Sequence, residues 1–252
     1  AAMQFWITET GIDGFRCDLA AWVCLDFWQE ARLQLEIAKP LFWLGEFDEL
    51  DNPDYGTVFD ASYSWAWMHT TKEFADGKKT VADLWDLLKR YNNLGDSSMR
   101  AWFTSNHDEN SWNGTEYEKY GKLALPLAVL STTWNGVPLI YNGQELPLLK
   151  RLQFFDKDII PWEADCLLNA FYTKLLHLKK SNPALLGCDN NVSTHIIENN
   201  APDKIMCYVR VNGNHRVFVI VNLSDESINL EMQLHHFGGI YLELFTDREI
   251  KI

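Results

Sequence analysis

The heptapeptide IDGFRCD, residues 12–18, ends on an arginine and an aspartate two positions apart. It is short and mostly apolar, as is typical of a buried strand. Side chains alternate between the faces of a strand, so Arg16 and Asp18 would share one face. A guanidinium beside a carboxylate favours the ionised form, which a nucleophile requires. The segment alone leaves two interpretations open, a structural ion pair or a catalytic carboxylate.

Strands and helices alternate through the first two thirds of the chain. Short apolar runs predict further strands at 41–45, 58–60, 100–104 and 137–141. Helices are predicted at 2–10, 26–37, 65–75, 81–91, 117–134 and 166–180, with Thr80 capping the fourth and Pro126 kinking the fifth. This alternation is typical of parallel strands joined by crossover helices.

The last third of the chain has a different pattern. Strand-like segments lie at 193–198, 204–211, 215–223, 227–234 and 240–245. Asn212-Gly213 between two of them is a strong hairpin signal. We therefore predict an α/β domain at 1–184 and a small antiparallel β-sandwich at 185–252.

Composition limits the possible partners. Of 252 residues 47% are hydrophobic, enough for a sizeable core, and the formal net charge is −13. This acidity argues against a nucleic-acid partner and against an anionic membrane surface, whereas a neutral ligand is indifferent to it. No apolar run approaches the roughly 18 residues of a membrane span.

The five cysteines form no CxxC pair and no metal-ligand pattern with histidine. We interpret them as small buried hydrophobic residues, not as a disulfide framework or a zinc site. This slightly favours a cytoplasmic protein. A leader upstream of Ala1 would lie outside the sequence, so a secreted or periplasmic protein stays open.

Three predicted strands are followed by an acidic residue, namely Asp18, Glu46 and Asp108. Parallel strands wrapped by helices place their carboxyl ends on one face, where barrel enzymes hold their catalytic groups. Acidic residues also follow strands by chance in an acidic protein, so the pattern alone leaves catalysis and coincidence open.

The segments GFRCD (14–18), LGEFDE (44–49) and FTSNHDEN (103–110) resemble three of the four signature regions of the α-amylase family, glycoside hydrolase family 13. VPLIYNGQE (137–145) resembles the eighth barrel strand of that family. The order and intervals also match. The resemblance implies strands four to eight of a (β/α)8 TIM barrel, followed by the β-sandwich domain.

By that resemblance, Asp18 is the nucleophile, Glu46 the general acid/base and Asp108 the carboxylate that stabilises the distorted sugar. Arg16 is the partner of the nucleophile, and His107 hydrogen-bonds the hydroxyls of the sugar being cleaved. A retaining glycosidase keeps its two catalytic carboxyl groups roughly 5–5.5 Å apart. Neighbouring strands about 4.7–4.9 Å apart meet that requirement.

Four further residues are candidates for contact with the sugar. Asn106 flanks His107 within the motif, and Trp112 in the following loop could stack on a pyranose. Asp60 and Tyr63, at another predicted strand end, could line the cleft. Each also has a structural alternative, because most tryptophans and many polar residues beside strands belong to the core.

The chain departs from the family pattern in two places. A Lys-His pair that usually follows the nucleophile and contributes to a calcium site is replaced by Ala21 and Trp22. The first signature region and the calcium-bearing excursion after the third strand are missing. We therefore expect no structural calcium, no other metal and no cofactor.

The missing region also suggests a chain truncated at both ends, with an incomplete sandwich. A half barrel exposes the edges of its outer strands, so we expect pairing with a second copy or with the missing half. A site that lacks half its pocket should be weakly active or inactive alone, because catalysis depends on positioning.

The expected activity is retaining hydrolysis of α-1,4 bonds in starch or glycogen, as in an α-amylase. Transglycosylation or branching of α-glucans uses the same three acids and remains an alternative. A third possibility, from another class, is a carbohydrate-binding protein that keeps the scaffold without catalysis. A phosphate-binding α/β enzyme would need a glycine-rich loop after a strand, which the sequence lacks.

Overall fold

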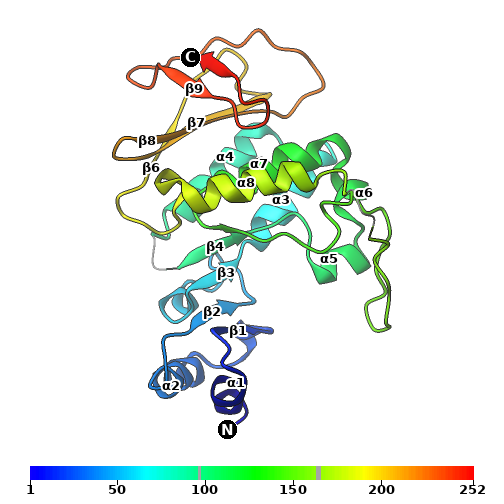
Figure 1. Cartoon of the computed structure of the whole chain (residues 1–252), viewed down its shortest axis with the longest axis vertical. Coiled ribbons are helices and arrows are strands. Elements are labelled where there is room, and N and C mark those ends of the chain that lie inside the picture. Colours follow the sequence, from blue (N-terminus) through cyan, green and yellow to red (C-terminus); the bar gives the residue numbers. More distant parts are fainter. Residues whose placement is uncertain (96–97, 163–165) are drawn as a thin grey trace.

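In a computed structural model of the protein, residues 1–95, 98–162 and 166–252 are described. The chain is elongated, with the amino terminus and a parallel sheet toward one end and antiparallel sheets at the other (Figure 1). Within the described ranges, no helix has both the length and the apolarity needed to cross a bilayer.

Five parallel strands form the first sheet in the order of the sequence. They are β1 (Gly14–Cys17), β2 (Phe42–Gly45), β3 (Ala61–Tyr63), β4 (Met99–Trp102) and β5 (Val137–Pro138). Gly14 is required for the first pairing, because a Cβ there would lie 2.0 Å from the Phe42 carbonyl oxygen. β1 and β5 have one neighbour each, so the sheet is a partial barrel with two edges.

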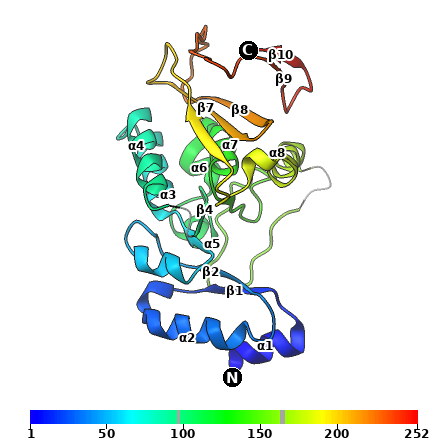
Figure 2. The same cartoon turned by 90° about the vertical axis from the view of Figure 1, so that its left-hand side faces the viewer.

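Helices pack along the parallel sheet, and most of them lie between its strands in the sequence (Figure 2). They are α1 (Ala2–Thr10), α2 (Leu25–Leu35), α3 (Trp65–Ala75), α4 (Val81–Asn92), α5 (His107–Trp112), α6 (Glu116–Tyr120), α7 (Ala124–Thr133) and α8 (Asn169–Ser181). Short 3-10 turns lie at Ala20–Trp22, Pro53–Thr57, Gly121–Leu123 and Pro183–Leu185. Thr80 caps α4 through a reciprocal capping box with Asp83, as predicted from the sequence.

Two predicted elements of the α/β part differ clearly from the structure. The third strand is not at 58–60 but at Ala61–Tyr63, because the backbone turns through a 3-10 helix just before it. The long helix at 117–134 is divided at Gly121, whose φ of 50° and ψ of −120° end α6. Pro126 lies in the first turn of α7, where its missing N–H costs nothing, so it does not kink the helix.

The antiparallel strands follow residue 192. β6 (Ser193–Ile196), β7 (Ile205–Asn212) and β8 (His215–Asn222) form one sheet, and β9 (Ile240–Leu242) and β10 (Glu249–Lys251) form another. The predicted strand at 227–234 is reduced to a single bridge, Asn199 to Met232. The domain boundary near residue 185 stays a prediction.

The three-stranded sheet shares its inner face with the α/β part. Met206 and Tyr208 on β7 pack into the same hydrophobic cluster as Leu84 on α4 and Leu127 on α7. The alternate residues of β7, such as Cys207 and Val209, face a second, smaller cluster. Helices α4 and α7 therefore lie between the two sheets, and a hydrophobic core that also includes Trp102 of β4 joins the two parts.

The cysteines are less uniform than the sequence suggested. Cys17 and Cys207 are buried, as predicted, but Cys24 is exposed at the start of α2. The interpretation of all five as buried hydrophobic residues is therefore wrong for Cys24.

Candidate active site

The register of the first two strands places two acids side by side. β1 and β2 are parallel neighbours, and Cys17 pairs with Gly45 at their carboxyl ends. Asp18 and Glu46 are the next residues on each strand, and the Glu46 N–H donates to the Cys17 carbonyl at 2.9 Å. The predicted meeting of these acids at neighbouring strand ends is therefore confirmed.

One guanidinium bridges both acids. Arg16 Nη1 lies 2.5 Å from Asp18 Oδ1, and Arg16 Nη2 lies 3.1 Å from Glu46 Oε2. The remaining nitrogen, Nε, donates to the Tyr63 hydroxyl at 3.3 Å, and the guanidinium lies over the Tyr63 ring. Tyr63 thus supports the site from beneath instead of lining an open cleft, since its side chain is buried.

The backbone after Asp18 folds back over Glu46. Leu19 has a φ of 43°, a left-handed conformation that is uncommon for a residue with a branched side chain. The Leu19 N–H donates to Glu46 Oε2 at 2.8 Å. Glu46 Oε2 therefore accepts a hydrogen bond from a backbone amide and forms an ion pair with Arg16, which together fix the orientation of the carboxyl group.

The pKa of Asp18 is lowered from its ordinary value. The hydrogen bond from Arg16 is the largest cause, and the charge of Arg16, an interaction with Glu46 and the charge of His107 act in the same direction. Asp18 is also well exposed, with 75% of its side chain accessible. An ionised and accessible carboxylate has the two properties that a nucleophile needs.

We expect Arg16→Gln to move the acidic limb of the activity profile to higher pH. Without the guanidinium the pKa of Asp18 rises toward its ordinary value, so the carboxylate is protonated sooner as the pH falls. The measurement is kcat/KM against pH. Arg16→Lys is the matched control, because it keeps the charge but cannot bridge two carboxylates in the same way. An unchanged limb in Arg16→Gln would contradict the electrostatic role.

Two buried acids anchor the loop that follows Glu46, and sequence reasoning missed both. Asp48 accepts hydrogen bonds from the Ala66 N–H at 2.8 Å and the Tyr91 hydroxyl at 2.5 Å, and burial raises its pKa. Glu49 accepts from the Ser98 hydroxyl and pairs with Arg100 at 3.2 Å. The available signal was the position of both acids, two and three residues after Glu46 and inside the recognised motif LGEFDE.

The third acid lies on a helix and not at a strand end. β4 ends at Trp102, and Asp108 occupies the first turn of α5. Asn106 caps this helix, since its Oδ1 accepts from the Glu109 N–H at 2.8 Å. Asn106 is 1% exposed, which argues against the expected direct contact with a sugar and favours a role in holding α5.

His107 and Asp108 lie close together after the carboxyl end of β4, a strand of the same parallel sheet as β1 and β2. His107 Nε2 is 3.6 Å from Asp108 Oδ2, and the His107 charge reaches Asp18, whose pKa it helps to lower. The imidazole side chain is 47% exposed, so it is available to a ligand. The structure thus brings Asp18, Glu46, His107 and Asp108 to one face of the partial barrel.

Comparisons with known proteins agree with this arrangement. The family model described as alpha amylase, catalytic domain, matches residues 1–159. The chain belongs to the α-amylase family. The family assignment and the α/β fold expected from the motifs are therefore confirmed.

Relatives of this α-amylase family member include several curated enzymes. Alpha-amylase 2 of Dictyoglomus thermophilum is 25% identical over 265 aligned positions, covering 97% of this chain and 44% of the relative. A cyclomaltodextrinase of a Bacillus species is 28% identical, covering 88% of this chain and 40% of the relative. The chain therefore spans less than half the length of these relatives.

Solved structures show the same fold. The maltogenic alpha-amylase AmyB from Thermotoga neapolitana superimposes with a TM-score of 0.85 at 24% identity, covering 99% of this chain and 58% of that one. An alpha-amylase from Geobacillus thermoleovorans in complex with acarbose gives a TM-score of 0.72 at 21% identity, covering 89% and 52% of the two chains.

Two other predicted cleft residues of this family member have different outcomes. Asp60 lies before β3, at the opposite end from the acids, and pairs with Arg32 at 2.8 Å. It also accepts from the Trp43 N–H at 2.8 Å. Its role is structural, and the prediction that it lines the cleft is wrong.

Trp112 lies in an exposed aromatic cluster on the same face as His107. Its ring centroid is 5.2 Å from that of Phe154, which in turn stacks on His107 at 6.4 Å. Phe155, 84% exposed, packs against both Phe154 and Trp112. Sequence reasoning missed the two phenylalanines, although the pair FF in a polar loop after the eighth-strand motif was a usable signal.

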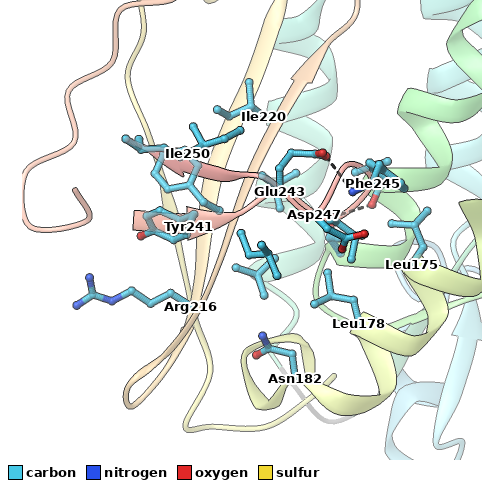
Figure 3. A pocket seen from close by; sticks show the side chains of 18 residues that line it. Leu175, Leu178, Asn182, Arg216, Ile220, Tyr241, Glu243, Phe245, Asp247 and Ile250 are labelled. Atoms are coloured by element: carbon cyan, nitrogen blue, oxygen red, sulfur yellow. Dashed lines mark hydrogen bonds between the residues drawn. The ribbon is translucent and has the colours of Figure 1, made fainter. Parts of the chain in front are cut away.

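One cavity of the described residues lies apart from the acids of the candidate site. A space of about 450 Å³ lies between α7, α8 and the antiparallel strands, lined by residues such as Leu175, Tyr241 and Ile250 (Figure 3). It contains none of the acids discussed above. Among the described residues, no group of three or more His, Cys, Asp or Glu side chains could hold a metal ion.

Proposed function

We propose that this chain carries the catalytic acids of a retaining α-glucan hydrolase that cleaves α-1,4-glucosidic bonds. In this proposal Asp18 is the nucleophile, Glu46 the general acid/base and Asp108 the carboxylate that stabilises the distorted sugar. The observation that carries the proposal is the single guanidinium of Arg16 shared by Asp18 and Glu46. The names of the relatives, which include an alpha-amylase and a cyclomaltodextrinase, support the α-glucan substrate.

The proposed mechanism has two displacements. Asp18 attacks the anomeric carbon while Glu46 protonates the leaving oxygen, and a covalent glycosyl ester forms on Asp18. Glu46 then takes a proton from water, which hydrolyses the ester and restores both carboxyl groups. Asp108 and His107 would hold hydroxyls of the sugar, because both side chains are accessible, with exposed fractions of 31% and 47%.

The test is the stereochemistry of the product. Maltoheptaose is incubated with the chain, and the anomer formed first is followed by proton NMR before mutarotation. The α-anomer is expected, since the bridging Arg16 holds the two carboxylates close together. Initial formation of the β-anomer would overturn the double displacement, and longer maltosaccharides among the products would favour transglycosylation over hydrolysis.

A carbohydrate-binding protein without turnover is the second candidate. The exposed aromatic cluster around Trp112 favours it, because such rings bind pyranoses without any chemistry. Binding of maltoheptaose to a chain that neither hydrolyses nor transfers it would support this reading. Between the two candidates, we propose weak hydrolysis of α-glucans for the chain alone.

Trp112→Ala is expected to weaken binding of maltoheptaose about fivefold, which corresponds to about 1 kcal/mol of lost ring contact. The measurement is the dissociation constant by calorimetry. Trp6→Ala is the matched control, because Trp6 is 52% exposed, close to the 57% of Trp112, but lies on α1. Equal effects of the two changes would show that Trp112 is not part of the binding surface.

We also propose that an edge of the partial barrel pairs with a second copy or with the complementary part of a barrel. β1 pairs with β2 alone, so one row of its backbone groups has no strand partner. Analytical ultracentrifugation over a concentration series is the test. A monomer at all concentrations would exclude self-association. The complementary part of a barrel would then be the remaining candidate partner for this edge.

A further inference from the structure

A buried polar network lies behind the candidate site and has no part in the mechanism above. Its centre is Glu116, at the start of α6, which is 2% exposed. The Thr104 hydroxyl donates to Glu116 Oε1 at 2.8 Å, and Gln144 Nε2 donates to Glu116 Oε2. The two oxygens of one carboxyl group therefore hold two segments that are far apart in the sequence.

The first of these segments leads to Asp108. Thr104 follows β4, and the next residues are the helix cap Asn106 and the start of α5. Lys119 strengthens this side of the network, because its Nζ donates to the Thr104 carbonyl at 2.9 Å and to Glu109 Oε2 at 2.9 Å. The backbone just before His107 and the first turn of α5 are thus both tied to α6.

The second segment is the turn after β5. The Tyr141 N–H donates to Gln144 Oε1 at 2.6 Å, and the Tyr117 hydroxyl donates to the Gln144 carbonyl. Gln144 Nε2 is also within 3.3 Å of the Tyr172 hydroxyl. Residues of the two segments, Ser105 and Asn110 from the first and Tyr141 from the second, line one small pocket. Burial, and then the charge of Asp108, raise the pKa of Tyr141. The turn therefore lies beside the segment that carries Asp108.

We propose that Glu116 is a positioning residue of the candidate active site, which keeps Asp108 and Tyr141 in a fixed relation by holding Thr104 and Gln144 together. The inference rests on the proposed function for its catalytic consequence. Glu116 is buried and acts through its neighbours, so it is not itself a catalytic residue. The chain has 35 acidic residues, and Glu116 is one of those that lie outside the family motifs.

The protonation state of Glu116 suggests the decisive substitution. Burial raises its pKa to about 7, against the effects of the Thr104 hydrogen bond and the Lys119 charge. A protonated Oε1 could donate to the Thr104 hydroxyl while Oε2 still accepts from Gln144, because a hydroxyl both donates and accepts. A glutamine at this position can make the same two bonds, whereas a leucine can make neither.

The experiment compares Glu116→Gln and Glu116→Leu in the full chain. Hydrogen–deuterium exchange is followed in peptides that cover 104–112 and 139–146, and kcat and KM are measured on maltoheptaose. Thr133→Val is the control for general destabilisation, because Thr133 is 2% exposed and bonds to Tyr208 away from the acids.

Glu116→Leu is expected to raise exchange in both segments and to lower kcat by about 10²-fold with a smaller change in KM, as a small misplacement of a catalytic group does. Glu116→Gln is expected to keep the protection of both segments and most of the activity. If Glu116→Leu fails to fold, Gln144→Met at the other end of the network is expected to reproduce the exchange pattern around Tyr141.

Exchange in Glu116→Leu that rises no more in these segments than in Thr133→Val would overturn the proposal. Equal losses in Glu116→Gln and Glu116→Leu would overturn it as well. If the unaltered chain turns over no maltoheptaose, the proposed function of this chain fails, while the exchange pattern still decides whether Glu116 holds the two segments.

Discussion

Asp18→Asn is expected to lower kcat on α-glucans by at least about 10³-fold, the scale seen when a nucleophile is removed from an otherwise intact site. The amide keeps the shape of the side chain but cannot form the glycosyl ester. Arg16 would still pair with Glu46, so the fold around the site should survive. The loss would therefore belong to the chemistry and not to stability.

The direct measurement is covalent trapping with a 5-fluoro-α-glucosyl fluoride, followed by peptide mass spectrometry. The label is expected on the peptide that contains Asp18 in the unaltered chain and on no peptide of Asp18→Asn. Asp13→Asn is the control, because Asp13 lies just before β1, is 97% exposed and pairs with Lys39 instead of Arg16. Activity of Asp18→Asn within tenfold of the unaltered chain would rule out Asp18 as nucleophile.

Arg100→Ala is expected to lower the free energy of unfolding by about 3–5 kcal/mol, because it leaves the Glu49 carboxylate buried without its charge partner. Arg100 and Glu49 are 3.2 Å apart, with side-chain exposures of 3% and 2%. Arg100 also donates to the carbonyl oxygens of Gly95 and Ser98. Because Glu49 anchors the loop after Glu46, activity should fall together with stability.

Urea denaturation followed by circular dichroism measures this loss. Arg151→Ala is the matched control, since Arg151 pairs with Glu118 at the surface, where an ion pair contributes about 0–1 kcal/mol. The double change Glu49→Leu with Arg100→Leu should recover part of the stability, because neither charge is then left alone in the core. A loss in Arg100→Ala no greater than in Arg151→Ala would show that the buried pair is not structural.

Local signals in the sequence predicted much of the fold. Helix α4 begins at its threonine cap, α3 has the expected bounds, and the parallel strands occur in the expected order. Such features depend on the residues of one segment and its immediate neighbours, so a pattern of a few residues is enough to predict them.

The errors occurred where the outcome depended on distant residues. Strand β3 begins at Ala61. The residue before it, Asp60, pairs with Arg32 and accepts a hydrogen bond from the Trp43 N–H. The sequence did not indicate the buried acids Asp48, Glu49 and Glu116, because their partners Tyr91, Arg100 and Gln144 lie in other segments of the chain. A buried charge is explained by its partners, and a linear sequence does not show them.

For the candidate site, the sequence by itself determined which acids are present, their order and the pairing of Arg16 with Asp18 on one strand face. Only the tertiary structure decided that the same guanidinium also binds Glu46 and that Asp108 approaches from a helix capped by Asn106. The physical reason is that period-two alternation acts within a strand, whereas the register between β1 and β2 and the buried network around Glu116 are set by packing across the whole sheet.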